Sequence, residues 1–142
     1  MKLLIYWSAL LFFFGGFMST RCEIGCLLPE GSVHVIYNHY DGYLDGVGLD
    51  LIKNWNSYEK AEEVVHGAYN NEEWQWDYNT IGDWINFLKK SDREYAYLWR
   101  NDHWEYITTA WDDNLHTVVW NTDWQDVKEG LRKLQKEIDE GY

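Results

Sequence analysis

The segment CEIGCLLPEGSVHVIYNHY, residues 22–40, decides how the fold begins. CEIGCLL and SVHVIYNHY are largely apolar, and PEGS between them supplies the proline and glycine of a turn. Two such runs around a glycine-containing turn are typical of a β-hairpin. The sequence therefore predicts two antiparallel strands at the N-terminal end of the folded domain.

Downstream of Asp41-Gly42, the apolar residues take the spacing of helices. One set falls at i, i+4 and i+8, a second forms a short stripe, and a third lies on one side of a helix that Thr80 and Asp83 open. In order, these three sets are Val47, Leu51 and Trp55; Ala61, Val64 and Val65; and Ile81, Trp84, Ile85 and Leu88. The stretch AYNNEEWQWDYN, residues 68–79, has no clear period, and we expect it to be an aromatic-bearing loop.

The second half of the chain has the alternating pattern of strands. EYAYLWR (94–100), WEYITTAW (104–111) and LHTVVWN (115–121) alternate large with smaller or polar side chains and are separated by turn residues. They predict a three-stranded meander. A last helix, capped by Thr122 or Asp123, is expected from regularly spaced apolar residues, namely Trp124, Val127, Leu131, Leu134 and Ile138.

This order of elements predicts one α+β domain. We expect a mostly antiparallel sheet, built from the N-terminal hairpin and the three-stranded meander, with about four helices packed on one face. The 142 residues are enough for one core, and 10 Trp, 11 Tyr and 5 Phe argue against a disordered chain.

Residues 1–17 form an apolar leader. No small-x-small pair ends the run as a signal-peptide cleavage site requires, and a membrane span needs roughly 17–25 apolar residues. We expect translation to start at Met18, which makes 18–142 the folded domain. A secretion signal or a membrane anchor is the alternative, and it applies only if residues 1–17 are retained.

Two stretches carry a resemblance to a known group of proteins. MSTRCEI (18–24) and VIYNHYDGYLDGVGLDL (35–51) resemble a family of small, uncharacterised phage and prophage proteins. Those proteins begin with Met-Ser-Thr-Arg and later carry a Tyr-x-His-aromatic-Asp-Gly-Tyr segment, and EYAYLWRNDHWEYI (94–107) matches more loosely. The chain departs from the family at Leu44, where a proline is expected, and in its apolar leader. The resemblance implies a phage protein in the host cytoplasm, starting at Met18, and implies no mechanism.

The end of the second predicted strand holds the candidate site. Side chains alternate along a strand, so Tyr37, His39 and Asp41 are expected on one face, with Tyr43 nearby. In the functional interpretation, His39 is a general base oriented by Asp41, and the tyrosines shape a ligand pocket. In the structural interpretation, Tyr37 belongs to the core, His39 lies at its edge, and Asp41-Gly42 makes the turn into the helix.

Other motifs point away from metals, cofactors and nucleic acids. Cys22 and Cys26 on one strand would be about 13 Å apart, too far to share a zinc ion or form a disulfide. Gly46-Val47-Gly48 lacks the third glycine of a dinucleotide fingerprint. The formal net charge of −12 repels phosphates. We therefore expect no metal, no cofactor and no direct contact with nucleic acid.

Two hypotheses of function remain. The first is a small acidic interaction protein of phage type that acts on a host protein. In one form it inhibits host defence by occluding a nucleic-acid-binding surface, with exposed Trp and Tyr as anchors. The alternative is a small-molecule-binding protein or an enzyme that uses the His39/Asp41 pocket. We expect the protein not to be an enzyme. The charge also has a simpler interpretation, which is that it keeps an aromatic-rich protein soluble.

Overall fold

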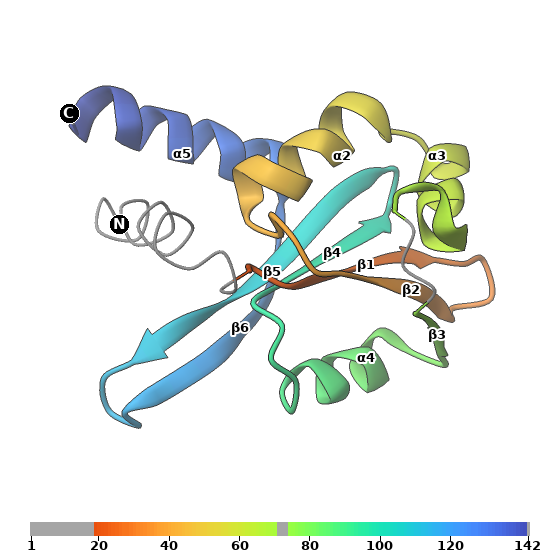
Figure 1. Ribbon diagram of the computed structural model, residues 1–142, viewed down its shortest axis with the longest axis horizontal. Helices are drawn as coiled ribbons and strands as arrows, with labels where there is room; N and C mark the ends of the chain where they lie inside the picture. Colours follow the sequence, from red (N-terminus) through yellow and green to blue (C-terminus); the bar gives the residue numbers. More distant parts are fainter. Residues whose placement is uncertain (1–18, 71–73, 142) are drawn as a thin grey trace.

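The computed structural model describes residues 19–70 and 74–141. In this part of the chain, strands form one six-stranded sheet in the order β3-β2-β1-β4-β5-β6 (Figure 1). The strands are β1 (Cys22–Leu27), β2 (Val33–Asn38), β3 (Gln75–Tyr78), β4 (Tyr95–Arg100), β5 (His103–Asp112) and β6 (Thr117–Asp126). The expected leader, residues 1–17, lies outside the described residues.

The sheet is mixed. β1 pairs antiparallel with β2, and β4, β5 and β6 pair antiparallel in chain order. The two groups are joined by a parallel pairing of β1 with β4, in which Ile24 lies opposite Tyr97. The expectation of a mostly antiparallel sheet made of a hairpin and a meander is therefore wrong. Alternation along a strand reports which side chains are buried but does not report the direction of the strand beside it.

The helices follow the expected order with different boundaries. They are η1 (Leu44–Gly48) and η2 (Val64–Ala68), which are π-helical turns, and α2 (Leu49–Asn54), α3 (Tyr58–Glu63), α4 (Ile81–Leu88) and α5 (Val127–Gly141). The Thr80 side chain caps α4 by accepting the N–H of Asp83, as expected. The predicted start of α5 is wrong, because β6 continues to Asp126, whose carboxylate accepts the N–H of Glu129. No helix in the described ranges combines the length and the apolar content that crossing a bilayer requires.

The helices cover both faces of the sheet (Figure 1). η1, α2, α3, η2 and α5 pack on one face, over a core that includes Ile24, Ile36 and Trp104. Helix α4 packs on the opposite face, where Trp84 and Leu88 cover a second core. The expectation that all helices share one face is therefore wrong. Helical periodicity identifies the apolar side of a helix, whereas the sheet here is apolar on both faces and offers two places for that side to pack.

β3 was expected to be part of a loop. Its residues pair antiparallel with β2, with Trp76 opposite Val35 and Tyr78 opposite Val33. Trp76 and Tyr78 are half-buried on the α4 face of the sheet, whereas Gln75 and Asp77 are exposed. β3 therefore places tryptophan and tyrosine side chains at the border between the core and the solvent.

Candidate functional site

The structure divides the four predicted site residues into two pairs. Tyr37 is buried at the end of β2, and its Oη lies 2.7 Å from Nδ1 of half-buried His39. Tyr43 donates its hydroxyl to Asp41 at 3.2 Å. Within residues 19–70 and 74–141, no contact joins His39 to Asp41. The use of His39 and Asp41 as a catalytic pair stays a prediction, and the contacts present orient His39 through Tyr37.

The glycines after Asp41 allow close packing at this corner. Asp41 has a positive φ of 56°, and its carbonyl accepts the N–H of Val47 at 2.9 Å. A Cβ on Gly46 would lie only 2.3 Å from that carbonyl oxygen, so only glycine fits there. The Tyr97 hydroxyl donates to the carbonyl of Gly42 at 2.7 Å. These contacts account for the glycines by packing of the chain against the sheet.

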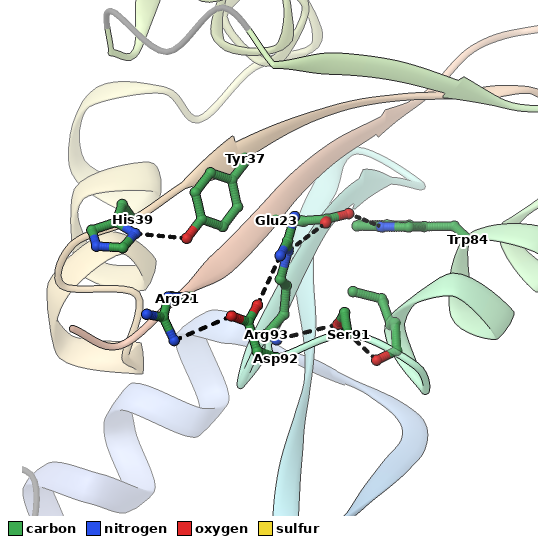
Figure 2. Close-up of polar contacts among 9 residues, drawn as sticks. Arg21, Glu23, Tyr37, His39, Trp84, Ser91, Asp92 and Arg93 are labelled. Atoms are coloured by element: carbon green, nitrogen blue, oxygen red, sulfur yellow. Dashed lines mark hydrogen bonds and ion pairs between the residues drawn. The ribbon is translucent and has the colours of Figure 1, made fainter. Parts of the chain in front are cut away.

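A buried carboxylate lies in β1 opposite Tyr37. The Glu23 side chain is fully buried in β1 on the α4 face of the sheet. Its Oε1 accepts the indole N–H of Trp84 and its Oε2 accepts the Nε–H of Arg93, each at 2.8 Å (Figure 2). Burial raises the pKa of Glu23, and the hydrogen bonds and the charge of these two partners oppose that rise. Both carboxylate oxygens are therefore used in holding α4 and Arg93 to the sheet.

Arg93 is held by a second carboxylate. Its Nη1 donates to Asp92 at 2.8 Å, and Asp92 also lies 3.3 Å from Nη1 of Arg21 (Figure 2). Burial raises the pKa of Asp92, but hydrogen bonding and charge from the two arginines outweigh it and lower this pKa overall. The network balances two carboxylates against two guanidinium groups. It fixes the position of Arg93, whose side chain is largely buried.

Arg93 in turn supports two aromatic rings. The guanidinium carbon lies 4.2 Å from the centre of the Tyr37 ring and 5.5 Å from the centre of the Phe87 ring. Both distances are within the range of a cation–π contact. Because Tyr37 comes from β2 and Phe87 from α4, Arg93 fixes aromatic groups from two elements relative to each other.

These rings belong to a continuous surface that we call the aromatic row. It runs across the end of β2, β3 and α4, and successive ring centres are 4.7 to 6.4 Å apart. In order along the surface, its members are Tyr40, His39, Tyr37, Trp74, Trp76, Phe87 and Tyr78. Of the predicted site residues, Tyr37 and His39 lie in the row, and Asp41 and Tyr43 do not.

The aromatic row is partly open to solvent. Tyr40 is 62% exposed, Trp74 56% and Phe87 36%. Large apolar side chains gathered on one surface mark interaction sites more often than single exposed ones do. Sequence reasoning missed β3 and the supporting Arg93, although the density of Trp and Tyr in residues 74–78 was a visible signal.

The opposite face of β3 is acidic. A shallow depression that is open to solvent is lined by Glu59, Glu62, Glu63 and His66. The His66 ring stacks on His34 at 4.7 Å, and His34 contacts Asp77 through Nδ1 and Gln75 through Nε2. The depression is thus linked to β3 through the two stacked histidines, and none of the four predicted site residues lines it.

The cysteines show no sign of a functional role. Cys22 and Cys26 are free and buried on the same face of β1. Burial raises the pKa of both thiols, that of Cys26 to about 12. A search of the described residues for clusters of His, Cys, Asp and Glu able to hold a metal ion finds none. Neither thiol is poised to be a nucleophile.

Comparison with protein-family models, curated proteins and solved structures finds no match for this chain.

Proposed function

We propose that this protein acts by binding another protein and that the aromatic row is the contact surface. The observation that carries the proposal is a run of seven neighbouring rings, partly exposed and supported from below by a fixed arginine. Interface residues that contribute most to binding are typically Trp, Tyr and Arg on a surface that is already ordered.

The charge indicates a basic partner. The chain carries 24 acidic against 12 basic residues. The segment of η1, α2 and α3, which covers the face of the sheet opposite α4, follows this bias. In residues 41–63 the acids are Asp41, Asp45, Asp50, Glu59, Glu62 and Glu63, and the bases are Lys53 and Lys60. An acidic surface accelerates association with a basic one and disfavours other partners.

A basic host protein that binds nucleic acid fits these features and the resemblance to phage proteins. Its nucleic-acid-binding groove would attract the acidic surface for the same reason that it attracts phosphates. Occupying such a groove would inhibit the host protein, which is how a phage protein could counter a host defence. The protein would then act in stoichiometric amounts in the host cytoplasm and would need no cofactor.

A comparison of three full-length proteins tests the proposal. The wild type, Trp74→Ala and Trp111→Ala are used to capture partners from a bacterial lysate at low and high salt. Trp111 is a matched control, because it is 59% exposed, close to the 56% of Trp74, but lies on the distant part of β5. We expect Trp111→Ala to capture the same protein as the wild type.

We expect Trp74→Ala to bind that protein about 30-fold more weakly, since a central aromatic contact contributes about 2 kcal/mol. We also expect capture by the wild type to fall at high salt, because the attraction between exposed charges is screened. Equal capture by Trp74→Ala and the wild type would show that the aromatic row is not the contact surface.

A further inference from the structure

β3 ends the sheet on the side of the aromatic row. It pairs with β2, and among the described strands it has no other neighbour. The strand is short and lies at the rim of the molecule (Figure 1), and it contacts α4 and η2. Edge strands present unpaired main-chain groups that another strand can use.

The register shows which groups these are. The Tyr37 N–H donates to the Trp74 carbonyl at 3.2 Å, which makes these residues a hydrogen-bonded pair. Hydrogen-bonded pairs recur at every second residue of an antiparallel ladder, so Trp76 and Tyr78 also direct their N–H and C=O toward β2. Gln75 and Asp77 direct theirs outward. An incoming strand would therefore find two donors and two acceptors on β3.

The two faces beside this edge differ in chemistry. On the α4 face, Trp76 and Tyr78 contact Phe87, and these three rings form one end of the aromatic row. On the other face, Asp77 is exposed and contacts His34, which stacks on His66 at the rim of the acidic depression. Side chains of an added strand would alternate between an aromatic surface and an acidic one.

We propose that β3 accepts an extended segment of the partner as an additional strand, and that this segment alternates apolar with basic residues. The inference rests on the proposed function and specifies how the partner binds. Apolar side chains of the segment would lie against Trp76 and Phe87. Its lysines or arginines would lie on the opposite face, near Asp77, Glu62 and Glu63. Strand addition supplies affinity through the main chain and specificity through alternate side chains.

A second copy of this chain is a poor occupant of the same edge. Paired β3 strands would bring two copies of Asp77 and two acidic depressions to one face, in molecules with a formal net charge of −12 each. Like charges at a contact disfavour association. A basic segment instead neutralises the acids, which is why we assign the edge to a partner.

The test uses short capped peptides and the full-length protein. The probe is a peptide in which valine and lysine alternate. One control peptide has the same composition, with its valines and lysines in separate blocks. The other keeps the alternation but has glutamate in place of lysine. Gln75→Pro removes an outward N–H without removing a bond to β2, a substitution that edge strands tolerate. Gln75→Ala is the matched control, because it loses the side-chain contact with His34 but keeps the N–H.

Binding is measured by an NMR titration that follows the amides of Gln75 and Asp77 and the indole of Trp76. We expect the alternating peptide to bind the wild type and Gln75→Ala equally and to slow hydrogen exchange of the two amides. We expect Gln75→Pro to bind about tenfold more weakly, since one main-chain hydrogen bond is lost. Both control peptides should also bind more weakly than the alternating peptide.

Equal binding by Gln75→Pro and the wild type, or by the block and alternating peptides, overturns strand addition. If Gln75→Pro does not fold, N-methylation of the peptide at the residues that face β3 replaces it, and undiminished binding then overturns the inference. Capture of the lysate partner separates the two proposals. If capture requires Trp74 but does not require the Gln75 N–H, the proposed function stands and strand addition is rejected. If capture does not require Trp74, the proposed function itself is rejected.

Discussion

Replacing Arg93 with methionine tests the buried network that supports the aromatic row. Arg93→Met keeps most of the aliphatic side chain but removes the charge that faces Glu23, which is 0% exposed. Removing one partner of a buried ion pair costs about 3–5 kcal/mol, because the remaining charge is left without compensation. This is a large share of the roughly 5–15 kcal/mol by which domains are stable.

The loss should depend on pH. Arg93 lowers the pKa of Glu23 against the effect of burial, so this pKa rises further in Arg93→Met. Such a carboxyl has a higher pKa in the folded protein than in the unfolded chain. It stabilises the folded state at pH values below its pKa in the unfolded chain, and this contribution is lost as the pH rises through its pKa in the folded protein. The deficit of Arg93→Met relative to the wild type should therefore be about 1–3 kcal/mol smaller near pH 5 than near pH 7.

Urea unfolding followed by tryptophan fluorescence measures these differences. Glu23→Gln/Arg93→Met leaves no charge to bury and keeps an acceptor for Trp84, so it should recover about 2 kcal/mol relative to Arg93→Met. Arg132→Met is the control, because the pair that Arg132 makes with Glu129 is exposed, and its loss should cost less than about 0.5 kcal/mol. A cost below about 1 kcal/mol for Arg93→Met, or a cost that does not vary with pH, would refute the reasoning.

Two further predictions concern packing. Gly46→Ala should destabilise the protein by about 1–3 kcal/mol, because the new Cβ meets the Asp41 carbonyl oxygen. Gly82→Ala is the control, because its Cβ would meet Thr80 Oγ1 at an ordinary contact distance of 3.7 Å, and it should be neutral or slightly stabilising in the same urea assay. Cys22 and Cys26 should not react with a thiol reagent at mildly alkaline pH until the protein unfolds, since both are buried with raised pKa values. Fast labelling of the folded protein would contradict the buried position of β1.

The sequence alone was sufficient to predict the strands and helices whose signals lie within a short segment of the chain. The two apolar runs around PEGS correspond to β1 and β2, and Thr80 caps α4 as its position before an apolar stripe predicts. The arrangement of these elements depends on contacts between distant segments. The parallel pairing of β1 with β4 joins residues about seventy positions apart, and nothing in either segment encodes the direction of its neighbour.

β3 was missed because a short edge strand has a weak pattern. Of the side chains of β3, Tyr78 packs against the core, and the pairing of the strand is supplied by β2. The aromatic row could not be predicted for the same reason, since it exists only once β3 is placed beside Tyr37. Glu23 carried one signal, a carboxylate within an otherwise apolar strand, but its partners Trp84 and Arg93 are far along the chain.

Hydrogen–deuterium exchange of the full-length protein, free and bound to the captured partner, tests the central claim most directly. A partner on the aromatic row should slow exchange in β3 and α4. If the partner also adds a strand to β3, the largest change should be at Gln75 and Asp77. The tip of the β5–β6 hairpin, residues 112–117, should be unchanged. Slowed exchange confined to that tip or to α5, with β3 unaffected, would contradict the account.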